Sequence, residues 1–75
     1  MELSAENGDV DAKLQLGESY AFDDDMIDYD KAMEYFLAAA DAGSIDAMNN
    51  IGWLYESGTG VEKNQQTADM WYGRA

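Results

Sequence analysis

One nine-residue pattern occurs twice in this chain and strongly limits how it can fold. Residues 12–20 are AKLQLGESY and residues 47–55 are AMNNIGWLY, so both follow Ala-x-x-x-(Leu/Ile)-Gly-x-x-Tyr at a separation of 35 residues. The apolar positions of this pattern lie on one face of an α-helix. A repeat of about this length is typical of α-solenoids built from helix hairpins. The pattern therefore predicts a tandem helical repeat.

Apolar residues at helical spacing predict four helices, over residues 10–22, 29–42, 45–57 and from residue 65 onward. Asp, Ser and Asn side chains cap helix starts by accepting free amides of the first turn. We expect the caps to be Asp9, Asp28 or Asp30, Ser44 and Asn64. The inward faces are predicted to be Ala12, Leu16 and Tyr20; Ala32, Tyr35, Phe36 and Ala39; Ala47, Ile51 and Tyr55; and Ala68, Trp71, Tyr72 and Ala75.

Glycines add two kinds of constraint to these helices. Gly8 and Gly43 are expected to end a helix, where a positive φ is needed. Gly17 and Gly52 lie inside helices, where glycine costs about 1 kcal/mol relative to alanine. We expect a neighbouring backbone or aromatic ring to approach each of these two glycines too closely for a Cβ.

The second copy of the pattern continues into a turn with Gly58, Gly60 and Val61, and Val61 is expected to tuck beneath the hairpin. Asn64 and an Ala-x-x-aromatic-aromatic segment at residues 68–72 follow. Taken in this order, these residues resemble the Sel1-like repeat, a subfamily of the tetratricopeptide-like helical repeats. The first copy departs from the family at its turn, where residues 23–25 are three aspartates in place of the glycines.

The resemblance covers residues 8–75. It implies an all-α fold in which two helix-turn-helix repeats place four antiparallel helices in a short right-handed α-solenoid. It also implies protein binding without catalysis, because the family serves as adaptors. The implied organisation is a single repeat domain over residues 1–75, with 1–7 as a preceding partial helix or cap, 8–43 as the first repeat and 44–75 as the second, whose last helix is short or truncated.

Charge limits the partners of the chain. Sixteen acidic and four basic residues give a formal net charge of −12, which disfavours contact with nucleic-acid phosphates and with anionic membranes, and favours basic proteins or peptides. No apolar run approaches the roughly 20 residues of a transmembrane helix. The first residues lack the basic start and apolar middle of a signal peptide. We therefore expect a cytoplasmic protein.

Sites for catalysis, cofactors or metals are not predicted. The chain has no Cys and no His, and none of its hydroxyls has a base at a helical spacing that would activate it. The segment Asp23-Asp24-Asp25-x-x-Asp28-x-Asp30 could attract a hard cation such as calcium. It lacks the glycine that a helix–loop–helix calcium site needs at its sixth position, so we interpret it as a solvated connector that carries charge strain.

A second stripe of residues lies beside the repeated pattern. In repeats of the Sel1 type, the first helix of each unit lines the concave side, and this stripe is expected to face that groove. Trp53 is its most distinctive member, either as an anchor for a partner or as a residue packed on a neighbouring helix. A partner that is basic and carries an apolar anchor is predicted. The proposed protein-binding residues are Asp11, Leu14, Glu18, Asp46, Asn49, Trp53 and Glu56.

Two other functions remain open from the sequence. A compact acidic protein could mimic nucleic acid and block a nucleic-acid-binding protein, which would need carboxylates spread over one outer face. The chain could also be a structural slice of a longer solenoid, or could associate with itself through its ends, because about three repeats are usually needed for stability.

Overall fold

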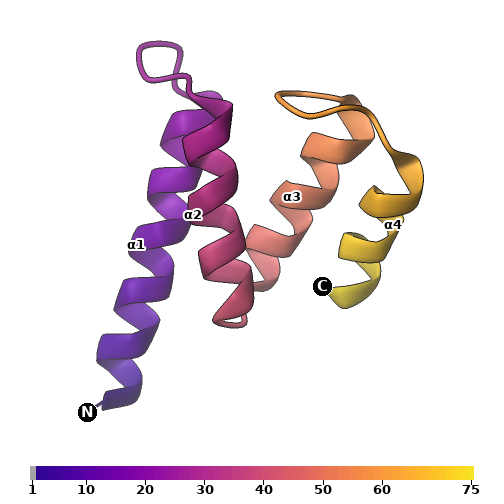
Figure 1. Cartoon of the computed structure of the whole chain (residues 1–75). Coiled ribbons are helices and arrows are strands. Elements are labelled where there is room, and N and C mark those ends of the chain that lie inside the picture. Colours follow the sequence, from indigo (N-terminus) through magenta and orange to yellow (C-terminus); the bar gives the residue numbers. More distant parts are fainter. Residues whose placement is uncertain (1) are drawn as a thin grey trace.

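The computed structural model describes the backbone of residues 2–75 and the side chains from residue 9 onward. Within these residues the chain forms four helices and no strand. Successive helices run antiparallel and lie side by side, which confirms the predicted all-α fold of two helix hairpins in a short α-solenoid (Figure 1). The helices are α1 (Glu2–Phe22), α2 (Tyr29–Asp41), α3 (Ile45–Ser57) and α4 (Gln65–Arg74).

The starts of α2, α3 and α4 are capped as predicted. In each case the capping side chain accepts the backbone amide of the third helical residue, which satisfies one donor left free in the first turn. Gly43 follows α2 with a φ of 101°, a left-handed conformation that suits glycine. The three caps are Asp28 with the Lys31 amide at 3.2 Å, Ser44 with the Ala47 amide at 3.1 Å, and Asn64 with the Thr67 amide at 3.0 Å.

The predicted start of the first helix is wrong. We expected Gly8 to end a preceding helix and Asp9 to cap the next, but α1 runs without interruption from Glu2 to Phe22. The residues before Gly8 include Leu3 and Glu6, which favour helix. A continuous helix keeps the backbone hydrogen bonds across Gly8, and these outweigh the cost of about 1 kcal/mol for one glycine.

Gly17 and Gly52 lie where an aromatic ring of the next helix approaches closely within each hairpin. A Cβ at Gly17 would lie 2.6 Å from the Phe36 ring of α2, and a Cβ at Gly52 would lie 2.8 Å from the Tyr72 ring of α4. Both distances are too short for real contacts, so each hairpin needs glycine here. The structure confirms the prediction and identifies the neighbour as an aromatic ring.

The core lies around α2 and α3. Ala32, Phe36 and Ala39 of α2 have no exposed surface, as the predicted face of this helix requires. On α3, Ala47 and Ile51 are equally buried, and the buried Leu54 joins them although we did not predict it. Helix α2 contacts both α1 and α3, and therefore joins the two repeats.

The predicted inward face of α1 is largely wrong. Ala12 is exposed, Leu16 is 40% exposed, and Tyr20 is half-buried. The corresponding residues of α3 are covered by α2, whereas no described segment covers this side of α1. Tyr20 is shielded in part because its ring stacks on that of Tyr35, with centroids 5.8 Å apart. Burial on α1 comes instead from Gly17 and Ala21, which face the hairpin.

The two hairpins close with the same hydrogen bond but different turns. The Asp28 amide donates to the Tyr20 carbonyl at 2.8 Å, and the Asn64 amide donates to the Tyr55 carbonyl at 2.9 Å. The second turn uses glycines with positive φ, and Val61 packs against the core as predicted. Both hairpins therefore end in the same way despite the different turn residues.

Helix α4 is only ten residues long. Ala68 is fully buried, and Trp71 and Tyr72 are half-buried, in agreement with the predicted face. Ala75 was predicted to point inward, but it is exposed because it follows the last helical residue.

Among the described residues, no helix combines the length and apolar character needed to cross a membrane.

Candidate functional site

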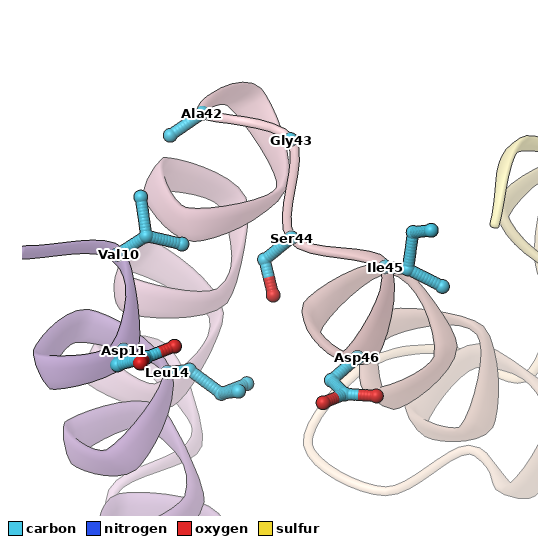
Figure 2. A pocket seen from close by; sticks show the side chains of 8 residues that line it. All are labelled: Val10, Asp11, Leu14, Ala42, Gly43, Ser44, Ile45 and Asp46. Carbon is cyan, nitrogen blue, oxygen red and sulfur yellow. The ribbon is translucent and has the colours of Figure 1, made fainter. Parts of the chain in front are cut away.

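A hollow of about 410 Å³ lies between α1 and the start of α3. The turn from α2 to α3 closes one of its ends (Figure 2). It exists because α1 and α3 each pack against α2 and make few direct contacts with each other. Its lining residues are Val10, Asp11 and Leu14 from α1, Ala42, Gly43 and Ser44 from the turn, and Ile45 and Asp46 from α3.

Three of the seven predicted binding residues line this hollow. Leu14 is half-buried, packs against the core and points from α1 toward α3, whereas Asp11 and Asp46 are exposed (Figure 2). The hollow thus has an apolar wall and carboxylates from both repeats. Among the described residues that line it, none is basic.

Glu18 and Asn50 connect α1 and α3 beyond the hollow. The Asn50 amide donates to a Glu18 carboxylate oxygen at 3.5 Å, at the limit of hydrogen-bonding distance. Both residues are half-buried. Glu18 was predicted as a binding residue, and it lies two helical turns after Asp11 on the same face of α1.

Trp53 both packs on a neighbouring helix and remains accessible. Its ring meets Phe22, the last residue of α1, edge to face with centroids 5.5 Å apart. Trp53 is 40% exposed and Phe22 is 48% exposed. The interpretation of Trp53 as a residue packed on a neighbouring helix is therefore confirmed, whereas its role as an anchor for a partner stays a prediction. We call the strip formed by these contacts the α1/α3 face: Val10, Asp11, Leu14, Glu18, Phe22, Asp46, Asn50 and Trp53.

Glu56 is not part of the α1/α3 face, in contrast to the prediction. It lies beside Tyr72 of α4, on the side of α3 that forms the hairpin. Burial raises the pKa of the Tyr72 hydroxyl above its usual 10.0, and the charge of Glu56 and a hydrogen bond to it raise the pKa further, with a smaller effect from Asp69. Asn49 is exposed on α3.

Three residues of the α1/α3 face were not among the predicted binding residues: Val10, Phe22 and Asn50. Phe22 was assigned only as the end of the first helix, yet it lies four residues after Glu18 and eleven after Asp11, which is the same helix face. This spacing could have identified it. The same spacing applies to Val10, four residues before Leu14, and to Asn50, four residues after Asp46.

Metal binding finds no support at the acidic connector. Among residues whose side chains are described, no three acidic groups come together in a way that could hold a metal ion. One oxygen of Asp23 instead accepts the amide of Asp25 at 3.1 Å, within the turn itself.

A second hollow, of about 370 Å³, lies between α2 and α4. Leu37, Trp71 and Arg74 line it, together with Ala38 and Asp41. The Arg74 guanidinium lies over the Trp71 ring, 4.7 Å from its centroid. None of the predicted binding residues lies here.

Each of the two hairpins corresponds to one unit of a known repeat family. The Sel1 repeat model matches residues 10–44 and again residues 45–75. The chain belongs to the Sel1 repeat family. Sel1 repeats generally mediate protein–protein interactions.

Longer fungal proteins contain similar segments. The ERAD-associated E3 ubiquitin-protein ligase component HRD3 of Candida glabrata is 38% identical over 65 residues, which cover 87% of this chain and 7% of that protein. The chitin synthase regulator SKT5 of Saccharomyces cerevisiae is 37% identical over 60 residues, which cover 80% of this chain and 8% of that protein. The chain therefore spans less than a tenth of these relatives. No solved structure matches it.

Proposed function

We propose that this Sel1 repeat chain is a non-catalytic module that binds a protein or peptide through the α1/α3 face. The observation that carries the proposal is the accessible strip across two repeats, with a hollow of about 410 Å³ at one end and the exposed Trp53 at the other. Large aromatic residues that are half accessible on the free surface are frequent anchors in interfaces. A location in the cytoplasm stays a prediction.

The charge of this face suggests the kind of partner. Asp11, Glu18 and Asp46 all lie on it, within a chain of net charge −12. Such a field attracts basic partners and speeds their encounter, while burial around apolar and aromatic groups supplies the affinity. The names of the two relatives, a ubiquitin-ligase component and a chitin synthase regulator, agree with a binding role.

Selection of peptides from a random displayed library on the immobilised chain would test the proposal. Synthetic copies of the recovered peptides are then titrated against Trp53→Ala, Glu18→Lys and the control Met70→Ala. Met70 is 51% exposed on α4 and lies on neither hollow. We expect each change on the face to weaken binding at least about tenfold, with the control unchanged. Equal affinity for all three variants would contradict the proposal.

Self-association is a second candidate function, and one observation favours it. Ala12 and Leu16 are exposed on α1, although the corresponding Ala47 and Ile51 of α3 are fully buried against α2. A helix of a second copy could cover this side of α1 in the same manner.

Sedimentation equilibrium can decide whether this face associates. If it does, the average mass rises with concentration for the wild type and for Leu37→Glu, but not for Leu16→Glu. Leu37 is a matched control because it is 42% exposed, close to the 40% of Leu16. A strict monomer at high micromolar concentration would exclude this second function.

A further inference from the structure

The hollow at one end of the α1/α3 face has the chemistry of a pocket for a long basic side chain. Val10 and Leu14 are partly buried and give it an apolar wall. The carboxylates of Asp11 and Asp46 come from facing helices of different repeats, and Figure 2 shows Asp46 directed toward α1. Lysine and arginine bury their methylene stems along apolar surface and keep the charged head near water or a counter-ion.

Other occupants fit this hollow less well. Calcium needs six to eight oxygen ligands, whereas the described side chains that line the hollow include two carboxylates. The Ser44 hydroxyl already accepts the Ala47 amide as the cap of α3. A purely apolar side chain would bring Asp11 and Asp46 toward an apolar environment without a compensating charge, which is unfavourable. A basic side chain can pack its methylene groups against the apolar wall and pair its charge with the carboxylates.

The other end of the face has a different chemistry. Phe22 and Trp53 meet edge to face and leave 48% and 40% of their surfaces exposed. Their ring faces can bury an aliphatic or aromatic side chain of a partner. Between the two ends, Asn50 donates to Glu18 at 3.5 Å and so connects α1 to α3.

We infer that these ends are two subsites for one peptide, in which a Lys or Arg enters the hollow and an apolar side chain covers Phe22 and Trp53. Asp46 and Trp53 lie seven residues apart on α3, which corresponds to about 10 Å along the helix. An extended peptide spans that distance in about three residues. The inference rests on the proposed function and adds the order and spacing of the two anchors.

The peptides recovered by library selection provide the first test. We expect them to share one basic and one apolar residue, about three positions apart in an extended peptide. Asp11→Asn and Asp46→Asn remove charge without changing shape, and should each weaken binding about tenfold and reduce its dependence on salt. Replacing the basic residue of the peptide by norleucine should have little further effect on binding to a variant with both Asn substitutions.

Phe22→Ala tests the second subsite. It should weaken binding of the same peptides about tenfold, while their sensitivity to salt stays that of the wild type. Met70→Ala remains the control on another helix.

The possible failures can be told apart. If the selected peptides lack a basic residue, or bind the Asn variants as tightly as the wild type, the two-subsite inference is overturned while Trp53→Ala still supports binding at this face. If no selected peptide responds to Trp53→Ala or Glu18→Lys, the proposed function fails, and the inference fails with it.

Discussion

Helices α1 and α3 contain the same Ala-x-x-x-(Leu/Ile)-Gly-x-x-Tyr pattern, yet their surroundings differ. Ile51 of α3 is fully buried, whereas its counterpart Leu16 in α1 is 40% exposed. The glycines behave alike, because Gly17 and Gly52 are both buried beneath an aromatic ring of the next helix. The glycine of the pattern is therefore buried in both repeats, whereas the Leu/Ile position is buried only in the second.

This difference separates two interfaces within the repeat. The glycine serves the contact inside a hairpin, which each repeat forms on its own. The alanine and the Leu/Ile position serve the contact with the helix of a preceding repeat, and α2 supplies that helix only to α3. The same residue types therefore stabilise the second repeat more than the first.

Substitution of the paired Leu/Ile residues should have the largest effect. Ile51→Ala removes a fully buried side chain and should lower the free energy of unfolding by about 2–5 kcal/mol. A domain of this size rarely has more than about 3–5 kcal/mol of stability, so this variant should be largely unfolded. Leu16→Ala should lower the free energy of unfolding by no more than about 1.5 kcal/mol, because the side chain is 40% exposed.

Urea denaturation followed by circular dichroism measures both variants. If Leu16→Ala and Ile51→Ala lose the same stability, the two helix faces are equivalent in solution, and α1 must be covered there as well.

The glycines should give the next largest effects. An added Cβ at Gly17 meets Phe36, which is fully buried and cannot move aside, so Gly17→Ala should lower the free energy of unfolding by about 1–3 kcal/mol. Gly52→Ala should lower it less, because the half-buried Tyr72 ring has room to shift. Gly73 is helical with no atom near its Cβ position, and Gly73→Ala should raise it by up to about 1 kcal/mol.

Thermal melts of these three glycine variants provide the measurement. Stabilisation by Gly17→Ala would show that the hairpins do not need the close approach seen in the structure.

Local features of the fold could be predicted from sequence, and features that depend on neighbours could not. The caps Ser44 and Asn64, and Asp28 as one of two candidates, were correct because each depends on its own first turn, whereas the Asp9 cap was wrong because α1 continues through it. The exposure of Leu16 was missed because it depends on whether another helix lies across it. At the candidate site, Asp11, Leu14 and Asp46 line one hollow and their role in binding stays a prediction, whereas Glu56 lies beside Tyr72 of α4.

The two turns offer a smaller contrast. The acidic turn at residues 23–25 follows the C-terminus of α1, where negative charge is unfavourable. Asp24→Lys should therefore raise the free energy of unfolding by about 0.3–1 kcal/mol at low salt. Thr59→Lys in the second turn is the comparison. It adds the same positive charge, but at a position that does not lie in a run of aspartates.

Melting temperatures at low and high salt distinguish these variants. The advantage of Asp24→Lys should shrink as salt screens the charges, and millimolar calcium should stabilise the wild type more than this variant. A wild-type melt that neither calcium nor salt alters would show that the acidic turn carries no charge strain.

The smallest expected effect concerns Tyr72, which occupies the position of Phe36 in the first repeat. Its pKa in the folded chain is raised above 10.0, first by burial and then by Glu56. The stabilisation linked to its neutral hydroxyl is therefore complete below about pH 10 and is lost as the pH rises through the raised pKa. Tyr72→Phe should remove this contribution to the loss of folding stability at alkaline pH, and should have little effect on stability at neutral pH.

Denaturation midpoints measured from neutral pH to above pH 10 would reveal the difference between the two repeats. Glu56→Gln gives an intermediate case, because it removes the neighbouring charge but leaves the burial of Tyr72 in place. We expect the alkaline loss to be largest in the wild type, smaller in Glu56→Gln and smallest in Tyr72→Phe. An identical loss in all three would mean that the Tyr72 hydroxyl is as solvated in the folded chain as in the unfolded one.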